Sequence, residues 1–384
     1  MKILVISECY PSEKQPQYSV FIKQQLDELR NLGYIVDVLV PIRSKIKERL
    51  ICVKDAVEPR YVLSYCTDRY EFFLHYNGKK ICNKINALVQ KERYDLIAVH
   101  ITSDTVLYAA LLLGNKWQIP VVQHYHGLNI WNNYVVKHPY REKWYAKRRE
   151  KLLSNCASII GVSNKVSDIV KRRIHTVPVY TVYNGVDLKL FYPEEHKKDF
   201  SKRLNIITVA NLIPIKGLKY LIEAFSKVYK RYPYASLKII GEGFLEDELK
   251  EQTKYLHINR AVIFLGKQNY KDVSKYMRES DIFVLPSFYE AIGCVYLEAM
   301  GCELPIIGIK SMGIAELIQD GVNGTLVEEK NSDSIFEKII YLAEHPDIAI
   351  NIGKAGRFTA QKYTWEASAK NLNKIYQRLI GGTK

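Results

Sequence analysis

The chain has 384 residues, of which 47% are hydrophobic, and this length predicts more than one globular domain. Seven scattered cysteines, with no CxxC pair, argue against a disulfide framework or a zinc knuckle and favour a reducing cytoplasm. The net charge of +15 leans toward the first half and suits an anionic surface such as membrane lipid. We see no basic–aromatic nucleic-acid module, signal-peptide core or membrane-spanning run, so we expect a cytoplasmic protein without a nucleic-acid partner.

Strands and helices alternate through the first half of the chain. Apolar runs and helical spacing predict strands at 3–6, 34–40, 94–100, 119–124, 157–163 and 181–187, and helices at 20–32, 79–92, 105–113 and 140–154. The opening βαβ unit lacks the GxGxxG fingerprint of a dinucleotide site. Residues 45–78 are rich in tyrosine and charge, and they predict no clear element.

The pattern restarts after a charged stretch, 193–202, which we interpret as the interdomain linker. Strands are predicted at 204–210, 237–241, 261–266, 281–286 and 305–308, and helices near 217–230, 246–256, 271–280, 294–300, 332–344 and 365–379. We therefore predict an α/β protein with two Rossmann-like domains, residues 1–195 and 196–364, and a C-terminal helix within 365–384 that packs back towards the first domain. Two parallel sheets with ligand-bearing loops at their strand ends imply a cleft between the domains.

The stretch 287–305 carries two carboxylates around a predicted helix start. Glu290 lies in the loop after a buried strand, Gly293 allows a tight turn, and Glu298 lies inside the helix that begins near Cys294. A helix N-terminus attracts anions, whereas carboxylates suit hydroxyls, so the combination indicates a phosphorylated sugar. Lys216, just before another helix start, is well placed for a phosphate. The alternative is an ordinary βα unit with two solvated glutamates.

His124 and His126 follow one another at alternate positions at the end of a predicted strand. They share a face, so a metal site is conceivable, but no third ligand stands near in sequence, and we predict none. A histidine at this edge can instead donate to a sugar hydroxyl, or simply satisfy loop carbonyls. The helix at 140–154 is strongly basic; with Trp144 it could rest on anionic lipid through Arg148, Arg149 and Lys151, or be a solvated face.

Taken together, the motifs resemble the retaining glycosyltransferases of family 4 (glycosyl transferases group 1), which have the GT-B fold. The strongest match is the Glu290-x7-Glu298 arrangement within SFYEAIGCVYLEAMGCELPII. The other matches are VYNGVD at 182–187, Lys216-Gly217, IGEG at 240–243, Gly313-x-x-Glu316 and His126-Gly127, so the resemblance covers nearly the whole chain.

The resemblance implies a role for each matching residue. Glu290 would hold hydroxyls of the donor sugar, Glu298 the ribose, and Lys216 the diphosphate leaving group, with His126 beside the anomeric centre. The backbone N–H groups of Ile292, Gly293 and Cys294 would face the sugar and diphosphate. The remaining donor-site residues would be Asn211, Gly217, Gly266 and Glu316, and those on the acceptor side Tyr18, Ser19 and Asn129.

The implied reaction moves a sugar from a nucleotide sugar, most often a UDP-sugar in this family, to a glycan or lipid-linked acceptor with retention. The family uses no catalytic metal or cofactor. Three residues differ from the usual pattern: Asn211 replaces an arginine, and Ser19 and Ala291 replace glycines. The first two motivate an alternative of another class, a glycosyltransferase-like subunit that serves as a scaffold for a partner transferase.

Overall fold

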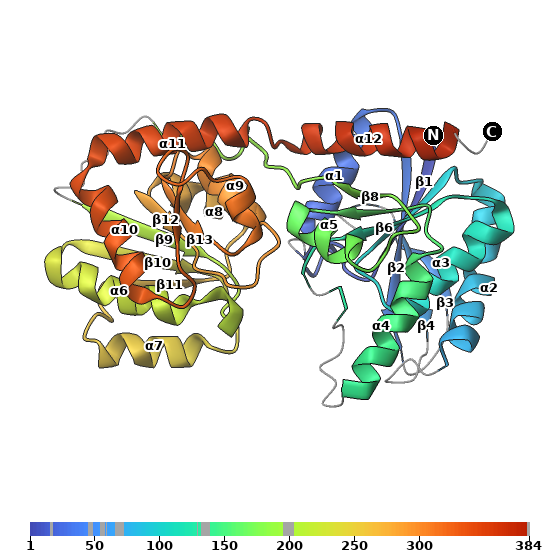
Figure 1. Cartoon of the computed structure of the whole chain (residues 1–384), viewed down its shortest axis with the longest axis horizontal. Helices are drawn as coiled ribbons and strands as arrows, with labels where there is room; N and C mark the ends of the chain where they lie inside the picture. The colour runs from blue at the N-terminus through green and yellow to red at the C-terminus, as the bar shows by residue number, and fades with distance from the viewer. Residues whose placement is uncertain are drawn as a thin grey trace. The chain divides into compact units, whose positions relative to one another are not determined.

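The computed structural model divides the chain into two compact units. It describes residues 1–15, 18–44, 49–53, 58, 60–65, 73–128, 130–131, 139–194 and 203–381. The first unit contains residues up to Tyr183 together with those from Trp365 onward, and the second runs from Asn184 to Thr364 (Figure 1). We predicted a boundary at 195/196; the units divide earlier because Leu190 and Phe191 pack with the second unit, where the Leu190 carbonyl accepts from Ser274 Oγ at 2.5 Å.

The first unit is built on a sheet of eight strands in the order β3-β4-β2-β1-β5-β6-β7-β8. All neighbouring strands are parallel except β3, which pairs antiparallel with β4 at the edge, so the predicted all-parallel sheet is mixed here. The strands are β1 (Lys2–Ser7), β2 (Ile35–Arg43), β3 (Arg49–Val53), β4 (Arg60–Tyr65), β5 (Leu96–His100), β6 (Val121–Tyr125), β7 (Ser158–Gly161) and β8 (Val179–Thr181). The intervening helices are α1 (Val20–Asn31), α2 (Leu74–Glu92), α3 (Asp104–Trp117), α4 (Pro139–Leu153) and α5 (Asn164–Lys171).

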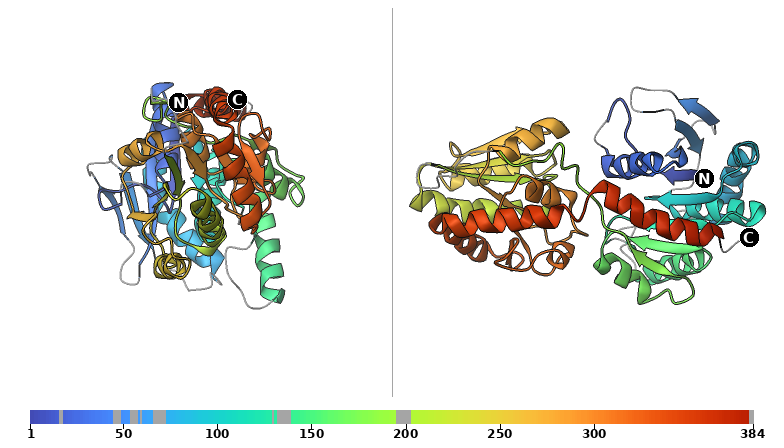
Figure 2. Two further views of the ribbon diagram at one scale, coloured as in Figure 1. Left: turned by 90° about the vertical axis from the view of Figure 1, so that its left-hand side faces the viewer. Right: turned by 90° about the horizontal axis from the view of Figure 1, so that it is seen from above.

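The C-terminal helix α12 (Trp365–Gly381) returns to the first unit and packs against α1 (Figures 1 and 2). Its apolar face, which includes Leu372 and Tyr376, joins the core formed by β1 and α1. A buried hydrogen bond of 2.9 Å from Gln25 Nε2 to Ser368 Oγ joins the two helices. The first and last parts of the chain therefore share one core.

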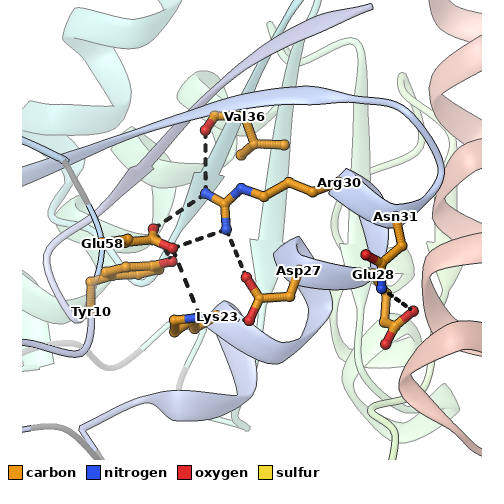
Figure 3. Close-up of polar contacts among 8 residues, drawn as sticks. All are labelled: Tyr10, Lys23, Asp27, Glu28, Arg30, Asn31, Val36 and Glu58. Carbon is orange, nitrogen blue, oxygen red and sulfur yellow. Dashed lines mark hydrogen bonds and ion pairs between the residues drawn. The ribbon is translucent and has the colours of Figure 1, made fainter. Parts of the chain in front are cut away.

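A polar network fastens α1 to neighbouring parts of the first unit (Figure 3). Tyr10 donates from its hydroxyl to Glu58 at 2.5 Å, and Arg30 donates to Glu58 at 2.9 Å and to Asp27 at 2.8 Å. Both of these bonds come from Arg30 Nη1, and Arg30 Nη2 donates to the Val36 carbonyl at 3.2 Å. Because charge-assisted bonds are directional, they fix the orientation of α1, whose N-terminus carries the predicted residue Ser19.

The second unit is built on six parallel strands in the order β11-β10-β9-β12-β13-β14. The strands are β9 (Leu204–Val209), β10 (Ala235–Ile240), β11 (Val262–Gly266), β12 (Ile282–Val284), β13 (Ile306–Ile309) and β14 (Thr325–Val327). The helices are α6 (Leu218–Arg231), α7 (Glu246–Tyr255), α8 (Tyr270–Arg278), α9 (Cys294–Gly301), α10 (Ser332–Glu344) and α11 (Pro346–Ala360), with 3-10 turns η1 (Pro214–Lys216) and η2 (Gly313–Glu316). Within the described ranges, no helix is both long and apolar enough to cross a membrane.

Candidate active site

The loops after β9 and β12 meet at the carboxyl end of the second sheet, where open α/β sheets place their ligands. Gly217 makes this contact feasible, because a Cβ there would lie 2.2 Å from the Pro286 carbonyl oxygen and the backbone has a φ of +68°. The Phe288 N–H donates to the Ile215 carbonyl at 3.0 Å. The two loops are therefore held together through their backbones.

This loop contact brings Lys216 and Glu290 into an ion pair between Nζ and Oε2. Both side chains are mostly buried, with exposed fractions of 17% and 18%. The pair lies 74 residues apart in sequence, and only the adjacency of β9 and β12 joins it. An ammonium and a carboxylate fixed side by side can face one ligand that carries both phosphate and hydroxyl groups.

The segment between Glu290 and α9 is fixed by a close contact with η2. A Cβ at Gly313 would lie 1.3 Å from the Ala291 carbonyl oxygen, and the Gly313 N–H donates to the Glu290 carbonyl at 3.3 Å. Ala291 does not have positive φ, so its backbone conformation is one that alanine adopts without strain. Gly293 has a φ of +77° and immediately precedes α9, whose N-terminus thus follows directly on the glutamate loop.

Glu298 lies on α9 and is 6% exposed. Tyr270, the first residue of α8, donates from its hydroxyl to Glu298 Oε1 at 2.7 Å. Burial raises the pKa of Glu298 from 4.5 to about 7, and the hydrogen bond from Tyr270 acts in the opposite direction. Sequence reasoning missed Tyr270, because nothing in its local pattern connects it to a residue on another helix.

Cys294, one of the predicted donor-site residues, is the first residue of α9 and is partly buried. Asn184 Nδ2 lies 3.4 Å from its sulfur, and burial raises the pKa of that thiol. Asn184 belongs to the motif VYNGVD and is the first residue of the second unit, so this contact joins the motif to the start of α9.

The other predicted donor residues lie at the ends of strands or in the turns that follow. Gly266 ends β11 with a φ of +63°, and its carbonyl accepts from the Gly241 N–H at 2.9 Å. Asn211 is exposed after β9. Glu316 ends η2 on the surface; burial, and then this nearby carboxylate, raise the pKa of Tyr363.

In the first unit, three histidines stack at the ends of β5 and β6. His100 Nδ1 lies 2.9 Å from His126 Nε2, and the His100 ring is 4.0 Å from the His124 ring. His124 Nε2 lies 2.8 Å from the Tyr376 hydroxyl on α12. Burial lowers the pKa of all three histidines, that of His126 to about 3, so all three rings are neutral at pH 7.

Two nitrogens of this stack, His126 Nδ1 and His100 Nε2, are buried without a hydrogen-bond partner in the described part of the chain. Because the two rings share one hydrogen bond, the tautomer of one sets that of the other. His126 Nδ1 therefore offers either an N–H or a lone pair to a ligand. The stack could not have been predicted from His124 and His126 alone, because His100 joins it through the pairing of β5 with β6.

The predicted acceptor-side residues lie at the start of α1. Ser19 precedes the helix with a φ of +53°, a left-handed conformation that glycine adopts without steric cost. The Tyr18 hydroxyl is 3.1 Å from Cys9 Sγ, and the Phe21 ring is 4.9 Å from the His126 ring. Asn129 lies outside the described residues.

One expectation about the basic helix α4 is wrong. Arg148 and Arg149 donate to Asp104 at 2.9 and 2.7 Å, and their side chains are only 11% and 6% exposed. They pair with α3 instead of facing lipid, because two adjacent guanidinium groups can bind one carboxylate from both sides. Lys143, Lys147 and Lys151 remain exposed on α4.

Comparisons with known proteins match both units. Residues 19–190 match the family description Glycosyltransferase Family 4, and residues 192–359 match Glycosyl transferases group 1. An uncharacterised glycosyltransferase of Methanocaldococcus jannaschii is 27% identical over 76% of this chain and 78% of its own. The alpha-monoglucosyldiacylglycerol synthase of Acholeplasma laidlawii is 26% identical over 92% and 91%. The crystal structure of HepE from Anabaena, in complex with UDP, has the same fold, with a TM-score of 0.75 and 18% identity over 98% and 100%.

Proposed function

Since the chain belongs to the glycosyltransferases of family 4 and has the GT-B fold, we propose that it transfers a sugar from a nucleotide sugar to a glycan or lipid-linked acceptor with retention. The observation that carries this proposal is the Lys216–Glu290 pair beside the start of α9. The second carboxylate, Glu298, lies on the same helix. A cation, a helix N-terminus and two carboxylates match the diphosphate and the two sets of hydroxyls of one nucleotide sugar.

In this proposal each charged group binds a different part of the donor. Lys216 and the N-terminus of α9 neutralise the diphosphate, Glu290 accepts hydrogen bonds from the transferred sugar, and Glu298 accepts from the ribose. When the donor binds, Lys216 shares its N–H donors between Glu290 and a phosphate oxygen, since an ammonium has three. The positive charge that stabilises the leaving diphosphate then comes from the protein, so the reaction needs neither metal nor cofactor.

The bond-making step in this proposal needs no charged histidine. The acceptor hydroxyl attacks the anomeric carbon on the face from which the diphosphate leaves, and a phosphate oxygen takes the hydroxyl proton. His126 stays neutral at pH 7 because burial lowers its pKa to about 3, so it contributes a hydrogen bond and no charge. The protein's contribution is positioning and electrostatic stabilisation.

Uridine is the proposed base, and a lipid-linked or glycan hydroxyl the proposed acceptor. The UDP complex of HepE supports the first choice, and the name of the Acholeplasma relative, a glycolipid synthase, supports a lipid acceptor. The scaffold alternative is not favoured, because the Lys216–Glu290 ion pair and the Tyr270–Glu298 hydrogen bond both form although Asn211 stands where the family usually has arginine.

The site assignment is tested by measuring turnover of UDP-, GDP- and ADP-sugars with Lys216→Ala and Glu290→Ala. We expect each variant to lose about 10²–10³ in rate, the usual cost of one preorganised electrostatic group. Lys219→Ala is the matched control, because Lys219 is exposed on the next turn, over the Tyr220 ring. Unchanged turnover in both site variants would show that the assignment is wrong.

The surface best suited to membrane contact is the exposed side of α4. There Lys143, Lys147 and Lys151 recur every fourth residue, next to Trp144, which is 48% exposed. We propose a peripheral location at the inner membrane face through this surface. Changing Lys147 and Lys151 to Glu should weaken sedimentation with phosphatidylglycerol vesicles but not with neutral vesicles; binding that ignores both the change and the lipid charge would refute the contact.

A further inference from the structure

We infer that Tyr270 is a positioning residue of the donor site: its hydroxyl holds the Glu298 carboxylate in the orientation and ionised form that accept from the donor ribose. The inference rests on the proposed function, since Glu298 has this task only if the chain takes a nucleotide sugar. It adds a residue that lies outside the motifs shared with the family.

Tyr270 is held through its ring and through the capped start of its helix. Asn269 caps α8 by accepting from the Asp272 N–H at 2.9 Å, which fixes the start of the helix. The Tyr270 ring packs edge-on against the Phe191 ring at 5.0 Å, and Phe191 is fully buried. The hydroxyl therefore reaches Glu298 from a rigid base, which is what a positioning residue requires.

A second set of contacts fixes α8 itself to the segment that holds Phe191. Ser274, one turn after Tyr270, donates to the Leu190 carbonyl at 2.5 Å. Arg278 donates to Ser274 Oγ at 2.7 Å. Because α8 and the Leu190–Phe191 segment are joined at several points, the Tyr270 hydroxyl cannot move away from Glu298 without breaking other bonds.

The hydroxyl has a chemical task because Glu298 is almost fully buried. Burial favours the protonated acid and has raised the pKa of Glu298 to about 7, whereas the hydrogen bond from Tyr270 favours the carboxylate. A carboxylate oxygen accepts hydrogen bonds, and accepts them more strongly when ionised. Tyr270 occupies Oε1, so Oε2 is the oxygen left to accept from a ribose hydroxyl.

Tyr270→Phe separates this task from simple packing, since it removes the hydroxyl and keeps the ring against Phe191. In steady-state kinetics of the full chain with UDP-sugar between pH 6 and 9, we expect the donor KM at pH 7 to rise about tenfold, with kcat within about twofold. The acid limb of the kcat/KM profile should lie at higher pH in Tyr270→Phe than in the parent protein. The difference in KM between the two proteins should become smaller toward pH 9, where Glu298 is ionised in both. An unchanged pH profile with an unchanged KM would overturn the inference.

Two further variants make the outcome specific. Tyr276→Phe changes a tyrosine on the same helix that lies beside Lys238, 5.6 Å from its Nζ, and it should leave KM and the pH profile as in the parent. Glu298→Gln should raise the donor KM and remove the acid limb. A donor KM unaffected by Glu298→Gln would refute both the ribose role and the inference; a KM raised by Glu298→Gln but not by Tyr270→Phe would overturn the inference alone.

Discussion

Replacing Glu298 by glutamine should make the protein more stable at alkaline pH, because the wild-type carboxylate is buried without a cationic partner among the described contacts. Burial raises its pKa from 4.5 to about 7, so the folded state binds this proton more tightly than the unfolded chain. At about 1.4 kcal/mol per pH unit, the difference between the two pKa values corresponds to about 3 kcal/mol. The wild type therefore has this stability below pH 4.5 and loses it as the pH rises through 7.

Urea unfolding of the full chain, for the wild type and for Glu298→Gln at several pH values, would measure this effect. Glutamine keeps an oxygen for the Tyr270 hydroxyl and nearly the same volume, so packing and the hydrogen bond are retained. The free energy of unfolding of Glu298→Gln minus that of the wild type should be near zero at pH 4.5 and rise to about 3 kcal/mol at pH 8. A difference that does not change with pH, or a variant less stable than the wild type at pH 8, would refute the reasoning.

Three further predictions concern other parts of the chain. Gly313→Ala would place a Cβ 1.3 Å from the Ala291 carbonyl oxygen and displace the loop that carries Glu290, so the rise in melting temperature caused by the donor should disappear. Gly381→Ala is the control, because a Cβ there meets open space, and this variant should keep the rise. Equal rises in the two variants would contradict the importance of the contact. Asp104→Asn should lower the free energy of unfolding by about 3 kcal/mol, because two largely buried guanidinium groups lose their counter-charge; a loss below about 1 kcal/mol in urea titration would show the pairing to be unimportant. Burial lowers the pKa of His126 from 6.5 to about 3, so the free energy of unfolding should decrease as the pH falls below 6.5, by up to about 1.4 kcal/mol per pH unit. In His126→Gln, the free energy of unfolding should depend less steeply on pH between pH 6 and 5.

The strand-loop-helix unit around Glu290 and Glu298 could be predicted because all its signals are local. A buried strand, a glycine and a helix start follow one another within a short stretch of sequence. The position of Lys216 just before a helix could also be predicted from its neighbours in sequence. Its pairing with Glu290 depends on β9 lying next to β12, and this order is a property of the whole sheet.

The residues that sequence reasoning missed are those recruited across elements. Tyr270 is 28 residues from Glu298 and on another helix, and its spacing within α8 gives no sign of a polar partner. His100 reaches His126 only through the register of two strands. Composition was misleading for Arg148 and Arg149: a run of basic residues predicts a charged surface, but one carboxylate on α3 was enough to bury two of them.

The two glutamates of the motif differ in how the fold balances their charge, and this difference agrees with the separate roles that we propose for them. Glu290 is beside the ammonium of Lys216, so its charge is already compensated before any ligand arrives. Glu298 has a hydroxyl as its described partner, so its charge is stabilised only by hydrogen bonds. A bound diphosphate would draw Lys216 partly away from Glu290. Hydrogen bonds from the sugar hydroxyls would then have to stabilise the negative charge of Glu290 in its place. Binding of phosphate at Lys216 and of the sugar at Glu290 would therefore favour each other, as the proposed binding of one nucleotide sugar across both residues requires.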